Sequence, residues 1–259
     1  MKKTSRWLVL ATIALCQPAF AFDFGNLQDL LKGGPAGQHS GAPTQAPAAT
    51  PALAALSNAE VGSGLKAALT RGAEAAVREL GRENGFYGDA KWRIPLPPAL
   101  QKAESLMRLA GMGSQADQLD LAINRAAEAA VPQAKTLLAQ AVKSMTLEDA
   151  KGILTGGDEA ATQYFQRKTE GPLTAKFLPI VARATDKVGL AQTYNRFAGQ
   201  ATQFGLIQQD QASIQSYVTK EALKRLYAAI GEQEKAIRAD PLGTGSKIIG
   251  KVFGAVAGR

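Results

Sequence analysis

The residues best suited to chemistry are an amide and a carboxylate within an alanine-rich segment, NRAAEAAVP at residues 124–132. Asn124 and Glu128 are four residues apart, so on a helix their side chains would share one face, and the flanking alanines would let another helix approach closely. We therefore expect Glu128 to be at least partly buried. Two interpretations are open: a structural polar network that holds helices in register, which we favour, or a carboxylate in a functional cleft.

A buried carboxylate needs a cation or hydrogen-bond donors, because an unpaired one would become protonated or would cost several kcal/mol. We expect Arg238, which follows the apolar Ile237, to pair with Glu128, with Arg167 and Arg93 as the other candidates. The sequence thus predicts a ligand-binding or structural polar cluster made of the following residues: Asn124, Arg125, Glu128, Arg167, Arg238 and Asp240.

A second candidate site is a loop in which aromatic and cationic side chains alternate: Phe86, Tyr87, Lys91, Trp92 and Arg93. Such a loop can bind a glycan or a lipid headgroup through stacking and cation–π contacts. The alternative, which we favour, is that the aromatic rings pin an extended, proline-rich loop onto a helical core.

Other chemistries have little support in the sequence. The single histidine, His39, lies in a Pro/Gly/Ala-rich stretch without a fixed environment, which argues against histidine catalysis and histidine metal ligation. Glycine-rich pieces such as TGGD lack the preceding strand and the lysine of a phosphate-binding loop. We assign no catalytic residue, no metal site and no cofactor.

Residues 1–21 are typical of a secretory signal peptide, with a basic start, an apolar run from Trp7 to Leu15 and a small-residue cleavage site that ends at Ala21. We expect cleavage after Ala21 and a periplasmic location. Lipidation of Cys16 is disfavoured because the bulky Leu15 precedes it. Cleavage removes the only cysteine, 3 of the 30 basic residues and none of the 22 acidic ones, which leaves a net charge of +5 and no thiol chemistry.

This moderate positive charge suits an anionic envelope lipid, a glycan or an envelope protein as partner. Dense Lys/Arg clusters of the kind that bind nucleic acid are absent from the sequence, so we expect no nucleic-acid partner. No apolar run reaches the roughly 18 residues of a membrane span, so we expect no transmembrane segment. The oligomeric state stays open.

Helical periodicity dominates the chain after the signal peptide. We expect a short amphipathic helix at 22–31, a flexible Pro/Gly/Ala-rich linker at 32–53 and a helical domain at 54–256. No alternation typical of strands is present. The sequence therefore predicts an all-α fold, a single bundle of about eight to ten helices.

Several helix ends carry recognisable signals. Ser57 with Glu60 predicts the start of a helix over 58–80, and Thr146 with Asp149 predicts another capping box. We expect Asp158 to cap the helix that begins DEAATQYFQRKT. A separate helical stripe runs from Leu173 to Val188 and should kink at Pro179. Ser114 with Asp117 predicts the start of the helix that Pro132 ends or kinks.

Eight short motifs occur in a characteristic order: NGFYG (84–88), RIPLP (93–97), NRAAEAAVP (124–132), TLEDAKGIL (146–154), AATQYF (160–165), YV (217–218), EKAIRADP (234–241) and KVFG (251–254). Over roughly residues 54–254 the chain thereby resembles the bacterial envelope proteins grouped as domain of unknown function number 4197. Asn84 departs from that pattern, which usually has Asp before GF. The resemblance implies an exported helical domain and implies no activity.

These observations predict a non-enzymatic binding or interaction module for an envelope lipid, glycan or protein. The alternative is a carboxylate-based hydrolase or transglycosidase acting on envelope material, with Glu128 as acid or base. A third hypothesis is a scaffold whose terminal helices carry the contacts. A deep polar pocket that contains Glu128 and a second carboxylate would favour the enzyme, whereas a shallow apolar groove would favour binding.

Overall fold

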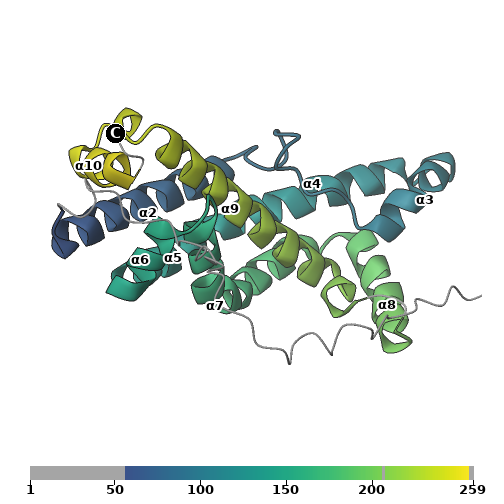
Figure 1. The fold of residues 1–259 in the computed structure, drawn as a ribbon. Coiled ribbons are helices and arrows are strands. Elements are labelled where there is room, and N and C mark those ends of the chain that lie inside the picture. The colour runs from purple at the N-terminus through teal and green to yellow at the C-terminus, as the bar shows by residue number, and fades with distance from the viewer. Residues whose placement is uncertain (1–55, 206–207, 257–259) are drawn as a thin grey trace, which may run out of the picture. The chain divides into compact units, whose positions relative to one another are not determined.

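The computed structural model describes residues 56–205 and 208–256, all within one compact unit that spans 46–259. These residues form α-helices α2 to α10 and short 3-10 helices, without a strand among them (Figure 1). The predicted all-α bundle of about eight to ten helices is confirmed. The signal peptide with Cys16, the helix expected at 22–31 and the linker with His39 lie outside the described residues.

The helices have the following bounds: α2 (Asn58–Leu80), α3 (Pro98–Leu109), α4 (Gly113–Ala130), α5 (Ala134–Lys143), α6 (Leu147–Thr155), α7 (Ala160–Thr185), α8 (Gly189–Gln203), α9 (Ile214–Ala239) and α10 (Lys247–Val256). The 3-10 helices are η2 (Val131–Gln133), η3 (Gln209–Gln211) and η4 (Leu242–Thr244). None of the helices in the described part of the chain is long and apolar enough to cross a membrane.

Two capping boxes start helices where the sequence predicts them. The Ser57 hydroxyl accepts a hydrogen bond from the Glu60 N–H at 3.2 Å, and the Glu60 carboxylate accepts one from the Ser57 N–H at 3.0 Å. Thr146 and Asp149 make the equivalent pair of hydrogen bonds at α6. Each box satisfies backbone donors that the first turn of a helix leaves free.

Other expected helix starts differ from the structure. α4 begins at Gly113 without a side-chain cap, so Ser114 and Asp117 do not start it. α7 begins without a cap from Asp158, and it continues as one helix through Pro172 and Pro179. Both prolines are exposed and lie seven residues apart, so they share the solvent face of α7, where water can reach the carbonyls they leave without a donor.

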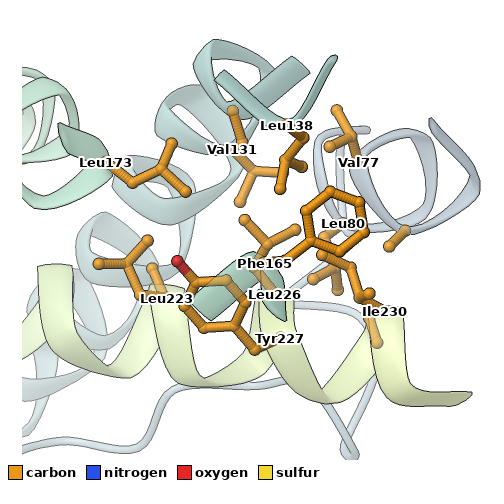
Figure 2. Packing of buried hydrophobic residues seen from close by; sticks show 14 of the residues in the cluster. Val77, Leu80, Val131, Leu138, Phe165, Leu173, Leu223, Leu226, Tyr227 and Ile230 are labelled. Atoms are coloured by element: carbon orange, nitrogen blue, oxygen red, sulfur yellow. The ribbon is translucent and has the colours of Figure 1, made fainter. Parts of the chain in front are cut away.

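The centre of the domain is the pair of long helices α7 and α9, which pack against each other. α4 packs against α7, α2 packs against α9, and α10 packs against α2 (Figure 1). Phe165 of α7 is fully buried between α2 and α9, with Leu80 of α2 on one side and Leu226 and Ile230 of α9 on the other (Figure 2). Burial of such a side chain stabilises the fold by about 1.5–3 kcal/mol.

Small residues allow the helices to approach closely. A Cβ atom added at Gly64 of α2 would lie 2.5 Å from Val252 and 2.9 Å from the carbonyl of Ile248, both on α10. The absence of a side chain at Gly64 therefore permits the close contact between α2 and α10.

Candidate functional site

Glu128 lies on α4 with its side chain only 6% exposed, so it is buried as expected. Its Oε1 atom accepts hydrogen bonds from the backbone N–H groups of Phe86 and Tyr87, both at 3.0 Å. Its Oε2 atom accepts one from Nη1 of Arg125 at 2.6 Å. The pairing predicted with Arg238 is therefore wrong: the cation comes from the same helix, three residues earlier.

Asn124 is fully buried one turn before Glu128. Its Oδ1 atom accepts a hydrogen bond from the Ile94 N–H at 2.8 Å, and its Nδ2 atom donates to the Ile94 carbonyl at 3.0 Å. These two hydrogen bonds satisfy both the N–H and the C=O group of Ile94, which lies in an extended segment without a neighbouring strand, in the described part of the chain, to pair with. The polar network thus fixes residues 81–97, which we call the clamped loop, to α4, whereas the sequence predicted a network between helices.

Residues of α9 hold the clamped loop from its other side. Nη2 of Arg225 donates to the Arg93 carbonyl at 3.0 Å, and the Tyr217 hydroxyl donates to the Pro95 carbonyl at 3.0 Å. Burial, which disfavours the charged phenolate, raises the pKa of Tyr217 to about 12. The phenol therefore remains a hydrogen-bond donor at every physiological pH.

Asn84 forms the sharp turn of the clamped loop, with a φ of 62°. Asparagine and aspartate adopt this left-handed conformation more readily than most residues. The Asn84 Oδ1 atom also accepts a hydrogen bond from Nη2 of Arg125 at 2.9 Å. Arg125 thereby links the turn of the loop to the carboxylate of Glu128.

The aromatic residues of the clamped loop mainly anchor it. Phe86 and Trp92 are buried, and Nε1 of Trp92 donates to the Glu79 carboxylate at 2.9 Å. The guanidinium carbon of Arg93 lies 4.4 Å from the ring centroid of Tyr87, and Nζ of Lys91 lies 4.6 Å from that of Trp92. A protein cation thus already covers one face of each of these two rings.

A second buried carboxylate, Glu234 of α9, caps the start of α7. Its oxygens accept hydrogen bonds from the N–H groups of Ala161 at 3.0 Å and Thr162 at 2.9 Å. Nη2 of Arg238 donates to the same carboxylate at 2.8 Å. Arg238 therefore neutralises Glu234, four residues before it on α9, and takes no part in the environment of Glu128.

The other expected members of the polar cluster also lie apart from Glu128. Arg167 is exposed on α7 and lines an open groove beside α6, together with Lys235. Asp240 follows α9, and its Oδ1 atom accepts a hydrogen bond from the Gly243 N–H at 2.9 Å. Of the predicted cluster, the structure brings together Asn124, Arg125 and Glu128 alone.

An open groove of about 570 Å³ lies beside the clamped loop, between α3, α4 and α9. We call it the loop groove. Its wall contains four cations and three carboxylates, together with small and apolar residues. The charged residues that line it are Lys91, Arg93, Glu104, Arg108, Asp117, Asp120 and Arg225.

Ion pairs hold these charged groups in place. Nη2 of Arg108 lies 2.8 Å from the carboxylates of both Glu104 and Asp117, which come from adjacent helices. Arg93 binds Asp120 of α4. The remaining cations pair with carboxylates outside the wall, Lys91 with Glu232 and Arg225 with Glu221.

A family model described as protein of unknown function, DUF4197, matches residues 55–254. The chain belongs to this family. Neither a curated protein nor a solved structure matches the chain. The matched range of this DUF4197 protein includes the clamped loop, both buried carboxylates and the loop groove.

Hydrogen bonding keeps the charges of the DUF4197 site fixed. The hydrogen bond with Asp120 raises the pKa of Arg93 above its ordinary value, and that with Glu128 does the same for Arg125. Arg108 lowers the pKa of the Asp117 carboxyl. Arg93, Arg125 and Asp117 are therefore charged at neutral pH, and the loop groove presents N–H donors next to carboxylate acceptors.

The geometry of the DUF4197 domain gives Glu128 the role of a hydrogen-bond acceptor. It accepts three hydrogen bonds, from Phe86, Tyr87 and Arg125, and it lines none of the described cavities. A general acid must reach its substrate, and the buried Glu128, with both oxygens bound by protein donors, is not placed to do so. In the part of the chain that the structure describes, no group of three or more His, Cys, Asp or Glu residues could hold a metal ion.

Three further residues position parts of the domain around the site: Tyr217, Arg225 and Glu234. Tyr217 and Arg225 bind the clamped loop, which precedes them by more than 120 residues, and no local pattern reports such a contact. Glu234 had a usable signal, because it precedes Arg238 by four residues on a helix and an ion pair at that spacing is favourable.

Proposed function

We propose that the protein is an exported, non-enzymatic module of the bacterial envelope that binds a glycan at the loop groove. The observation that carries this proposal is the pairing of every cation in the groove wall with a carboxylate. Such a wall offers fixed donors and acceptors side by side with little net charge. This arrangement suits the many hydroxyl groups of a sugar better than an isolated anion.

Export is the second component of the proposal, and it rests on the signal-peptide pattern of residues 1–21. We expect protein purified from the periplasm to begin at Phe22. Intact-mass analysis measures this directly. A retained N-terminus, or a lipid attached to Cys16, would contradict the proposed processing.

The hydrolase or transglycosidase hypothesis, with Glu128 as acid or base, has less support. Both oxygens of Glu128 are occupied by protein donors, and the clamped loop lies over them. A glycosidase acid is usually held in an apolar pocket open to substrate, with a second carboxylate within about 10 Å of it across the scissile bond.

Co-sedimentation of the mature protein with purified peptidoglycan sacculi tests the glycan proposal. We expect wild-type protein to bind the sacculi, and Arg108→Gln to weaken binding at least tenfold, because it removes the ion pairs with Glu104 and Asp117. Lys235→Gln is the matched control, since its ion pair with Glu159 is similarly exposed and lies outside the loop groove.

The outcomes separate the hypotheses. Absence of binding, or equal loss of binding in the Arg108 and Lys235 variants, would refute a glycan site in the loop groove. Release of soluble fragments from the sacculi by wild-type protein, abolished by Glu128→Gln in a folded variant, would favour the enzyme instead.

A further inference from the structure

A second groove, of about 630 Å³, is lined by residues of α2, α5 and α10 and by Ser246 just before α10. α5 and α10 both pack against α2 (Figure 1). Three basic side chains from two helices line this groove: Lys66 and Arg71 of α2 and Lys143 at the end of α5. We call it the cationic groove. Its volume is in the range of sites for small ligands.

The cations of this groove differ from those of the loop groove because they are not compensated. Lys66, Arg71 and Lys143 form no ion pair with any carboxylate in residues 56–205 and 208–256. The single carboxylate in the wall, Glu74, is already paired with Lys135 at 3.5 Å. The wall therefore keeps an excess of positive charge, which attracts anions and raises their local concentration.

Neutral hydrogen-bonding groups accompany the charges. The hydroxyls of Thr70 and Ser246 line the groove and, within the described residues, form no hydrogen bond with another side chain or the backbone. The buried side chains of Val142 and Ile249 contribute an apolar part to the wall. A ligand with several anionic oxygens on an organic carbon skeleton matches both features.

We infer that the cationic groove binds a phosphate ester, through charge-assisted hydrogen bonds from Lys66, Arg71 and Lys143. The phosphate oxygens accept from the basic side chains and from the hydroxyls of Thr70 and Ser246. The carbon skeleton lies against the apolar part of the wall. This site is separate from the loop groove and does not depend on glycan binding there.

Two probes distinguish the sources of such a phosphate ester. The soluble probe is glycerol 3-phosphate, measured by calorimetry with the full mature protein at low salt. The membrane probe is a vesicle of phosphatidylcholine with phosphatidylglycerol, compared with vesicles of phosphatidylcholine alone in a sedimentation assay. Binding of the soluble probe identifies a soluble ester as sufficient, and binding of the anionic vesicle alone identifies a lipid headgroup as the source.

The variant Lys66→Ala/Arg71→Ala/Lys143→Ala tests whether the groove is responsible. We expect it to weaken binding of the effective probe at least tenfold and to leave the melting temperature unchanged, since the three side chains form no ion pair or hydrogen bond within the described residues. Lys176→Ala/Arg183→Ala/Lys187→Ala is the matched control, because it removes the same charge from exposed cations of α7 and the turn after it.

The inference is overturned if neither probe binds the wild-type protein. It is also overturned if the control variant weakens binding as much as the groove variant, because the attraction would then come from the overall positive charge. Equal binding to vesicles with and without phosphatidylglycerol, together with no binding of glycerol 3-phosphate, would likewise exclude a phosphate-ester site.

Discussion

Replacement of Glu128 tests the most consequential contact of the fold, the clamp between α4 and the loop at 81–97. In Glu128→Gln, one oxygen can still accept the two backbone hydrogen bonds, but the amide N–H₂ group faces the guanidinium of Arg125. The variant therefore loses one charge-assisted hydrogen bond in a buried site. We expect the free energy of unfolding to fall by about 1–3 kcal/mol.

Glu128→Ala should have a larger effect, because it leaves the N–H groups of Phe86 and Tyr87 without acceptors. Each unsatisfied, desolvated amide costs about 1–3 kcal/mol, so the two together cost about 2–6 kcal/mol. Urea denaturation followed by circular dichroism and by the fluorescence of Trp92 measures the change. Trp92 lies in the clamped loop and is the only tryptophan after residue 21.

Hydrogen exchange adds a local measurement to the global one. The amide protons of Phe86 and Tyr87 should exchange faster in both variants than in the wild-type protein. Glu232→Gln is the control: its side chain is 46% exposed and binds Lys91 of the same loop, so its loss should cost less than about 1 kcal/mol. Wild-type stability and unchanged exchange in both Glu128 variants would refute the clamp.

Three further predictions concern the helix contacts. Gly64→Ala should destabilise the protein by about 1–3 kcal/mol, because the added Cβ would clash with α10. Gly62→Ala is the control: open space surrounds Gly62, so this variant should be as stable as wild type or more stable in the same denaturation assay. Equal effects of the two substitutions would contradict the close contact at Gly64. The hydrogen bond from Lys251 lowers the pKa of Glu60 from its ordinary value of 4.5 to about 2. The ionised Glu60 carboxylate therefore stabilises the fold above pH 4.5, and this stabilisation is lost as the pH falls toward 2. A stability difference between wild type and Glu60→Gln that persists undiminished at pH 2 would refute this. Glu234→Ala should cost several kcal/mol, because it leaves two N–H groups of α7 without an acceptor and the partly buried Arg238 without its carboxylate partner. Calorimetry showing an unchanged melting temperature would exclude that role.

Local sequence signals predicted the features that depend on neighbouring residues. The capping boxes at Ser57 and Thr146 involve atoms three residues apart, so the same hydrogen bonds form wherever the helix forms. The spacing of apolar residues along each helix predicts which face of the helix is buried. The burial of Glu128 also followed from its alanine neighbours, since small residues indicate close packing.

The helix starts that were predicted wrongly show where local signals compete with tertiary contacts. Asp158 has the right residue type to cap α7, but the carboxylate of Glu234 reaches the free N–H groups from another helix and is fixed there by Arg238. Proline at 179 interrupts a helix in isolation, yet α7 continues through it because the opposite face is buried against α9.

The sequence by itself determined that the chain is helical, where many of its helices begin, and which residue types could form polar sites, because these properties depend on short-range periodicity and composition. Only the tertiary structure decided the backbone partners of Glu128 in the clamped loop, the anchoring of Phe86 and Trp92, and the separation of the paired charges of the loop groove from the unpaired charges of the cationic groove. Those contacts join residues far apart in the chain, such as Arg225 with the carbonyl of Arg93. Their energies depend on distance and on exclusion of water, which the order of residues along the chain does not specify.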